Sequence, residues 1–519
     1  MITLRSFLVP FTFALLTSCA SLPPQTDRIQ THAITDTQDT RLGIAFTPQE
    51  KQHPDESAFH LLPDAVNALV ARFVLAEGAD RTLDLQYYIW HDDLTGRELA
   101  AAVMRAADRG VRVRILLDDL GTNADDKLLL ALDSHPNVQI RLFNPVANRT
   151  FKKIGMATEF FRVNRRMHNK AMIADNEGAI LGGRNIGDEY FGASTNVAFG
   201  DLDVFVHGPV VREVSTAFDL YWNSEAAYPV DRLIGRKADA GALADVRAKS
   251  DTYLASEENN PYVVNARERL TKVIHSEQDT TYSWGKATLL YDDPSKITRS
   301  PGNAQGHLMT QLKAMELQPK QQLLVVSPYF VPGKEGVAWL SGLTQKNVRV
   351  TVLTNSLAAT DVAAVHAGYQ RYRKALLKAG VRLYELKPGA DKKDDKDKKH
   401  VFGSSKASLH AKTYVFDRDS IFIGSMNLDP RSVELNTEIG VYCESPPAAA
   451  QVVDTVEPNL DYEAWRLELR PNPNGTQSIV WIDTARDGTV KVLDSEPDVS
   501  GLRKAGIWFL SILPIESQL

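Results

Sequence analysis

The stretch FRVNRRMHNKAMIADNEGAILGGRNIGDEY, residues 161–190, decides the fold. It contains the spacing H-x-K-x(4)-D-x(6)-G-[GS]-x-N, which returns late in the chain between residues 410 and 427. The repeated positions are His168, Lys170, Asp175, Gly182, Gly183 and Asn185 in the first copy, and His410, Lys412, Asp417, Gly424, Ser425 and Asn427 in the second. Two copies in one chain indicate one active site built from two halves.

The residues around each copy also repeat. Alternating or continuous apolar runs predict strands, and helical patterns lie between them. The predicted strands are residues 82–90, 111–117 and 138–143 in the first half, and 321–330, 348–354 and 381–386 in the second. This order predicts a duplicated α/β fold: two β-sheet halves flanked by helices, with a pseudo-two-fold active site between them.

The segments outside the repeated runs set the expected domain boundaries. Residues 19–55 are polar with little periodicity, which is typical of a tether. Apolar periodicity then begins, and a stretch rich in Ala and charged residues separates the two repeats. We expect a first half at 56–229, a helical connector at 230–295, a second half at 296–446 and a C-terminal extension at 447–519.

The N-terminus has the features of an export signal. Arg5 precedes an apolar run at residues 6–16 that is too short to span a bilayer. The sequence Leu16-Thr17-Ser18-Cys19 resembles a bacterial lipoprotein signal, which predicts a signal peptide at 1–18 and lipidation of Cys19. The protein would then lie in the bacterial cell envelope, anchored to the inner or outer membrane and facing the periplasm. An ordinary secretory signal or an uncleaved apolar N-terminus are the alternatives.

Composition excludes several classes of protein. The 519 residues are 43% hydrophobic and carry a net charge of -6, so no basic field exists to hold nucleic acid. Besides Cys19, only Cys443 remains, and we expect it to be buried in a strand. The chain has no H-E-x-x-H, C-x-x-C or EF-hand spacing, so we expect no metal and no cofactor.

The repeated residues suit a phosphodiester substrate. Side chains two residues apart on a strand point to one face, so each half offers an imidazole beside an ammonium group. A neutral histidine can attack phosphorus, and a second, protonated histidine can give its proton to the leaving oxygen. Lysine and asparagine side chains can neutralise the charge on the remaining phosphate oxygens.

These residues resemble the paired motifs of the phospholipase D superfamily. The stretches LDLQYYIWHDD, RRMHNKAMIAD, GSMNLDPRS and LNTEIG are similar to those of C-type bacterial cardiolipin synthases. The resemblance implies a phosphatidyltransferase that passes a phosphatidyl group to histidine and then to phosphatidylglycerol, giving cardiolipin. Phosphatidylethanolamine is a second candidate substrate. The alternative is phospholipase D hydrolysis, which gives phosphatidic acid. A nuclease and a non-enzymatic lipid-binding lipoprotein agree less well with the charge and the intact motifs.

The resemblance also implies a role for each repeated residue. His168 would be the nucleophile, and His410 the acid and later the base. The phosphate would be bound by Lys170, Lys412, Asn185, Asn427 and the Ser425 hydroxyl, which Gly183 replaces in the first half. Asp175 and Asp417 would hold strand ends. A carboxylate must orient each imidazole, and the matching positions are Glu438 and, in the first half behind His168, Asp203.

Two further segments are candidates for contact with a membrane. Residues 148–166 interleave Arg and Lys with Phe, which suits an anionic membrane surface, although a solvated loop with core aromatics is the alternative. Residues 507–514, IWFLSILP, are too short to span a bilayer. They either lie in the membrane interface, which we favour, or pack on the core.

Overall fold

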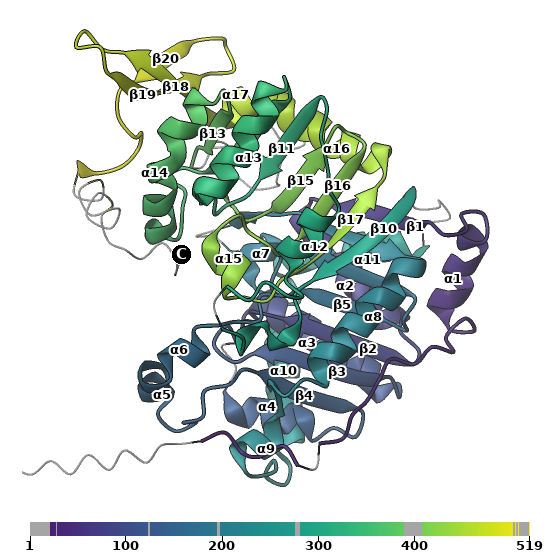
Figure 1. Cartoon of the computed structure of the whole chain (residues 1–519). Helices are drawn as coiled ribbons and strands as arrows, with labels where there is room; N and C mark the ends of the chain where they lie inside the picture. Colours follow the sequence, from purple (N-terminus) through teal and green to yellow (C-terminus); the bar gives the residue numbers. More distant parts are fainter. Residues whose placement is uncertain are drawn as a thin grey trace, which may run out of the picture.

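Two α/β halves lie against each other in the computed structural model, which describes residues 21–501 except 27, 123–124, 195–197, 276–280, 301 and 389–406, together with 504, 507 and 518. In Figure 1 the first half, in purple and blue, lies below the second half, in green and yellow. The predicted signal peptide at 1–18 and Cys19 lie outside the described residues.

The first half is built on one twisted sheet. Its strands are β1 (Ser57–Leu62), β2 (Thr82–Tyr87), β3 (Arg112–Asp118), β4 (Val138–Phe143), β5 (Ala171–Ala174), β6 (Gly178–Gly182), β8 (Asp203–His207) and β9 (Ala227–Pro229). They pair in the order β1-β8-β6-β5-β2-β3-β4-β9. Strands β2, β3 and β4 are parallel, and β5, which follows the first H-x-K motif, runs antiparallel to β2.

The second half repeats this topology strand for strand. Its strands are β10 (Ser283–Tyr291), β11 (Gln322–Val326), β12 (Arg349–Asn355), β13 (Arg382–Leu386), β15 (Lys412–Phe416), β16 (Ser420–Gly424), β17 (Ile439–Glu444) and β18 (Ala464–Pro471). They pair in the order β10-β17-β16-β15-β11-β12-β13-β18. The predicted duplicated α/β fold is therefore confirmed. Cys443 is buried on β17, as expected.

Helices cover both faces of each sheet. The outer faces are covered by α2 (Ala65–Gly78), α3 (Leu94–Asp108) and α4 (Asp126–Asp133) in the first half, and by α13 (Gly333–Gln345) and α14 (Ala363–Lys378) in the second. Between the sheets, α8 (Pro209–Trp222) and α16 (Pro446–Val456) share one apolar core with both inner faces. Val214 of α8 and Val453 of α16 are both fully buried in this core. Burial of this common core holds the two halves in one position.

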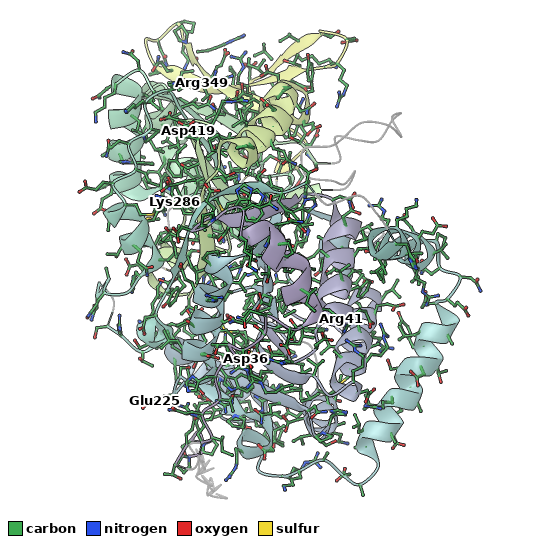
Figure 2. All side chains as sticks on the ribbon, turned by 90° about the vertical axis from the view of Figure 1, so that its right-hand side faces the viewer. Asp36, Arg41, Glu225, Lys286, Arg349 and Asp419 are labelled. Carbon is green, nitrogen blue, oxygen red and sulfur yellow. The ribbon has the colours of Figure 1, made fainter. Side chains whose placement is uncertain are left out.

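Two of the expected domain boundaries fall inside the second repeated half. Strand β10 pairs with β17 and also with β1, so the second half begins inside the segment expected to be a connector. In Figure 2, Lys286 of β10 lies between the labelled residues of the two halves. At the other end, α16 and β18 repeat α8 and β9, so the second half continues past residue 446. The remaining extension contains β19 (Gln477–Thr484) and β20 (Val490–Leu493), which continue the second sheet from β18.

The segment before β1 is not a free tether where the structure describes it. The backbone oxygen and hydroxyl of Thr31 accept hydrogen bonds from Arg114, which is fully buried on β3. Residues 41–50 form α1 (Arg41–Glu50), and Thr37 and Thr40 before it are buried. Figure 2 shows Asp36 and Arg41 lying over the first half. The segment before β1 is polar because its polar groups form hydrogen bonds with the first half.

Candidate active site

Backbone hydrogen bonds join the two H-x-K motifs to the opposite halves. The backbone N–H of His168 donates to the carbonyl of Thr437 over 2.9 Å, and that of His410 donates to the carbonyl of Gly200 over 2.8 Å. Thr437 and Gly200 each precede an acidic residue. The start of each motif strand is therefore fixed against the acid-bearing segment of the other half.

Each motif imidazole meets a carboxylate from the other half. Nδ1 of His168 lies 2.9 Å from Oε2 of Glu438, and Nδ1 of His410 lies 2.6 Å from Oδ2 of Asp201. The two carboxylates have no exposed surface, and the histidines are 9% and 6% exposed. A carboxylate that accepts the Nδ1 proton fixes the tautomer and leaves the Nε2 lone pair free for a substrate. The same arrangement therefore occurs twice, related by the pseudo-two-fold axis.

The prediction that Asp203 orients His168 is wrong. Asp203 instead accepts a hydrogen bond of 2.9 Å from Arg72, itself fully buried, and one from the backbone of Arg184. Strand register explains the error: Gly182 pairs with Asp203, whereas the equivalent Gly424 pairs with Gly440. Asp201 is therefore the residue equivalent to Glu438. The segment GDLDVFV contains two aspartates that are two positions apart, and only the register distinguishes them.

The two lysines are buried beside the histidines. Nζ of Lys170 donates to the carbonyl of His168 over 2.5 Å, and Lys412 donates to the carbonyl of His410. Burial lowers the pKa of Lys170 well below its usual value. Burial also lowers the pKa of Lys412, to about 8, although Asp201 and Glu438 act to raise it. A bound phosphate would offset this cost, because it adds negative charge beside the two ammonium groups.

The histidines are neutral at pH 7 before a substrate enters. Burial lowers the pKa of His168 to about 4, against the opposing influence of Glu438. Burial, followed by the Lys412 charge, also lowers the pKa of His410. Burial acts to raise the pKa of Asp201, but the His410 imidazole and its hydrogen bond outweigh it and hold the value at about 2. A neutral imidazole beside an ionised carboxylate is the form that a nucleophile requires.

The hydroxyl of Ser425 does not face a phosphate, contrary to expectation. It donates a hydrogen bond to Glu438 and accepts one of 3.0 Å from the backbone of Ile439, and the residue has no exposed surface. In the first half, a Cβ at Gly183 would lie 2.2 Å from Oδ1 of Asp201. Ser425 lies beside the longer side chain of Glu438, and Gly183 lies beside the shorter side chain of Asp201. The asymmetry between the motifs therefore concerns how each carboxylate is held.

The two asparagines differ in how their side chains are held. Oδ1 of Asn185 accepts a hydrogen bond from the backbone N–H of Ile89 at 3.2 Å, and the side chain also forms a hydrogen bond with Tyr190. Asn427 is 4% exposed, and within the described part of the chain its Oδ1 has no hydrogen-bond partner. Buried polar atoms without partners are rare unless a ligand completes them.

Asp175 and Asp417 hold strand ends. Asp175 accepts hydrogen bonds from the backbone N–H groups of residues 80–82, and Asp417 accepts three from residues 320–322. Each aspartate thus ties the motif hairpin to the start of the neighbouring parallel strand, β2 or β11. Their backbones are left-handed, with φ of 51° and 52°. They position the motifs without reaching the catalytic imidazoles.

Aromatic rings form the walls of the site. The ring of Tyr88 lies edge-on to His168, with centroids 5.1 Å apart. Tyr190 and Phe199 lie 5.4 Å and 5.1 Å from the ring of His410. These three residues were not among the predicted site residues, although Tyr88 directly follows β2 on the side where catalytic loops gather. Rings that exclude water strengthen every electrostatic interaction in the site.

One cluster of metal-type ligands occurs among the described residues. His91, Asp93 and Glu189 have ligand atoms within 4.8 Å of one another. Nδ1 of His91 lies 3.1 Å from Glu189, and this hydrogen bond is the main cause that raises the pKa of His91. The ion pair accounts for the arrangement, and Asp93 is already used as the N-cap of α3. We assign no metal to this cluster.

Comparison with known proteins agrees with this geometry. A model of the "Cardiolipin synthase, PLD-like domain" family matches residues 75–222 and 313–458, one match in each half. The chain belongs to this family. It is 41% identical to cardiolipin synthase C of Escherichia coli (strain K12) over 486 residues, which cover 92% of this chain and 99% of that protein. It is 28% identical to cardiolipin synthase A of Pseudomonas entomophila (strain L48) over 77% of this chain and 68% of that one.

The fold is also found among solved structures. The crystal structure of phosphatidylserine synthase from Haemophilus influenzae Rd KW20 superposes with a TM-score of 0.55 at 13% identity. The superposition covers 89% of this chain and 96% of that chain. At this identity the likeness shows the fold alone. It supports the assignment of both halves to one duplicated phospholipase D-like architecture.

Proposed function

We propose that the chain is a phosphatidyltransferase that makes cardiolipin from phosphatidylglycerol and a second phospholipid through a phosphohistidine intermediate. One observation carries this proposal: two buried histidines, each oriented by a carboxylate from the opposite half, lie beside two buried lysines. This pair of imidazoles suits a reaction in two displacements at phosphorus. The family membership and the similarity to cardiolipin synthase C support the lipid substrate.

In the first displacement, Nε2 of His168 attacks the phosphorus of the donor phospholipid. The N–P bond forms, the P–O bond to the head-group alcohol breaks, and protonated His410 gives its proton to the leaving oxygen. Glu438 stabilises the positive charge that develops on His168. The anionic diester favours the protonated form of His410 when it binds, because it adds negative charge to a buried site.

In the second displacement, neutral His410 removes the proton from a hydroxyl of phosphatidylglycerol. The hydroxyl oxygen then attacks phosphorus, and the N–P bond to His168 breaks. The lysine ammonium groups and the amides of Asn185 and Asn427 hold the phosphate oxygens in both steps. Water in place of the hydroxyl would give phosphatidic acid. The low exposure of both histidines and the surrounding rings favour transfer over hydrolysis.

The helical hairpin of α5 (Lys152–Thr158) and α6 (Phe160–Val163) supports contact with a lipid surface. It projects from the body of the first half in Figure 1. Phe161 is 87% exposed, Phe151 61% and Ile154 58%. Several cations around them form ion pairs within the protein; Arg149, for example, pairs with Asp119 and Asp126. We propose that the hairpin enters the membrane interface mainly through apolar contact.

A lipid anchor at Cys19 in the cell envelope forms part of the same proposal. Within the residues that the structure describes, no helix is both long and apolar enough to cross a bilayer. The run at 507–514 is described only at Ile507, which is 2% exposed and packs with Leu357 and Ala367. At this residue the run packs on the protein, in contrast to the interfacial position that we favoured.

The test is a lipid assay. The purified protein is incubated with phosphatidylglycerol liposomes, with and without phosphatidylethanolamine, and the lipids are resolved by mass spectrometry. Cardiolipin supports transfer. Phosphatidic acid alone would replace the proposal by hydrolysis, and the absence of both products would refute it. His168→Ala and His410→Ala should each abolish the product.

A further inference from the structure

A cavity of about 440 Å³ lies in the first half, away from the catalytic residues. It is partly open to solvent and is bordered by α3, α4, the outer face of β3 and β4, and a third helix, α10 (Ala242–Ser256). Its walls are mainly apolar and include Val103, Met104, Ile115, Leu129, Ile140 and Leu254. The volume and the apolar lining are those of a small-molecule site.

The helix α10 covers this cavity without filling it. A helix that lies on a core normally buries one apolar stripe, yet none of the described residues of α10 is buried. Contacts at its edges hold it in place. Arg247 pairs with Asp108 of α3 at 2.6 Å, and Tyr253 lies 4.3 Å from the guanidinium of Arg97. The apolar walls of the cavity are therefore open to water, and an apolar occupant would stabilise the fold by covering them.

One end of the cavity is lined by Trp90 and His91, which closely follow Tyr88, the residue that packs on His168. Trp90 forms a β-bridge with Ile186, the residue after the phosphate-site Asn185. His91 contacts Glu189, whose neighbour Tyr190 packs against His410. These contacts place this end of the cavity beside the segments that carry the phosphate-site residues.

We propose that this cavity, the α10 cavity, receives an acyl chain of a phospholipid substrate whose phosphate lies between the two histidines. The inference rests on the proposed function, because that function requires substrates with long apolar chains. The charged residues at the cavity, such as Arg97, Asp108 and Arg247, pair with one another or with a ring at its edges. The cavity walls therefore present an apolar surface that suits an uncharged chain. The acyl chain fills the apolar space that α10 covers but does not fill.

Photochemical labelling tests this directly. Phosphatidylglycerol with a diazirine near the end of one acyl chain is irradiated with the full-length protein, and the adducts are mapped by peptide mass spectrometry. We expect adducts on residues of α3 and α10. Ser250→Trp, which fills the cavity from α10, should reduce them about tenfold, because each excluded methylene costs roughly fourfold in affinity. Ala100→Phe fills the cavity from α3 and should act in the same way.

The matched control is Ala248→Trp, which places the same side chain on the exposed side of α10 and should leave the labelling unchanged. Adducts that lie only elsewhere, or that persist in both filled variants, would overturn the inference. A second assay separates it from the proposed function. Cleavage of bis(p-nitrophenyl) phosphate, which has no acyl chain, should be unaffected in Ser250→Trp. Labelling of the cavity in a protein that makes no cardiolipin would refute the function and leave the lipid site standing.

Discussion

Nδ1 of His168 lies 2.9 Å from Oε2 of Glu438, a residue that follows it by 270 positions in the chain. His410 makes the reciprocal contact with Asp201 of the first half. Neither half therefore contains a complete catalytic unit, because each imidazole depends on a carboxylate that the other half supplies. The duplication gives two interlocked acid–histidine pairs rather than two independent sites.

The neighbouring aspartates Asp201 and Asp203 should behave differently when each is changed to asparagine. Asp201→Asn removes the charge behind His410 and should lower kcat by roughly 10²–10⁴-fold with little change in melting temperature. Asp203→Asn leaves the buried Arg72 without its ionic partner and should mainly lower the melting temperature, at a cost of about 3–5 kcal/mol. Kinetics and thermal unfolding of the two variants check this. The reverse pattern would restore Asp203 as the orienting acid.

Exchange of the residues at Gly183 and Ser425 should have unequal effects. Gly183→Ser introduces a Cβ that would lie 2.2 Å from the Asp201 carboxylate, so it displaces the partner of His410 and should reduce activity by at least about 100-fold. Ser425→Gly removes one hydrogen bond to Glu438 and should cost about tenfold. Rates with a soluble diester measure both effects. Equal losses would show that the two carboxylates are held in the same way.

The pH profile should show an alkaline limb caused by Lys412. Its pKa is lowered to about 8, so the ammonium is charged below that pH and is lost as the pH rises through it. The profile of kcat/KM should therefore contain a limb near pH 8 through which it falls, in addition to the limbs of Lys170 and His410, whose pKa values burial also lowers. On the acid side it should not fall through His168 until the pH approaches its pKa of about 4.

Lys412→Arg supplies the control for this profile, because a guanidinium stays charged throughout the range. Whatever its maximal rate, the variant should lose the limb near pH 8. If the limb stays at the same pH, another group is responsible.

The exposed hairpin should affect binding to lipid surfaces but not the cleavage of soluble substrates. Phe151→Ser with Phe161→Ser removes two exposed rings and should weaken binding to phosphatidylglycerol liposomes by about tenfold or more, while cleavage of a soluble diester is retained. Liposome co-sedimentation measures the binding. Trp339→Ser on α13 removes another exposed ring, far from the hairpin in sequence, and should have no effect. Equal weakening by both variants would remove the hairpin from the membrane contact.

The duplication could be predicted from the sequence because local patterns encode it. Residues 111–117 and 348–354 alternate or run apolar and each precedes an H-x-K string, and both form the expected strands, β3 and β12. Asp175 and Asp417 also hold strand ends as predicted, since aspartates that close a motif strand are recognisable from their position alone. Periodicity of two and fixed offsets are properties of a single segment.

The wrong predictions concern residues whose role depends on contacts between segments that lie far apart in the chain. The choice between Asp201 and Asp203 depends on the pairing of β6 with β8, and a two-residue difference in register leaves the alternating sequence pattern unchanged. The role of Ser425 depends on the position of Glu438 beneath it. The polar segment before β1 packs because Arg114 on β3 requires acceptors there. None of these relationships is visible as a spacing along the chain.

Isolation of the covalent intermediate tests the two-half site most directly. The protein is mixed with phosphatidylglycerol, quenched rapidly under alkaline conditions that preserve phosphohistidine, and its peptides are mapped by mass spectrometry. We predict a phosphatidyl adduct on His168 that is absent in His168→Ala and at least tenfold less abundant in Glu438→Gln at early times. An adduct on His410, or cardiolipin formation with no histidine adduct at any time, would contradict this assignment.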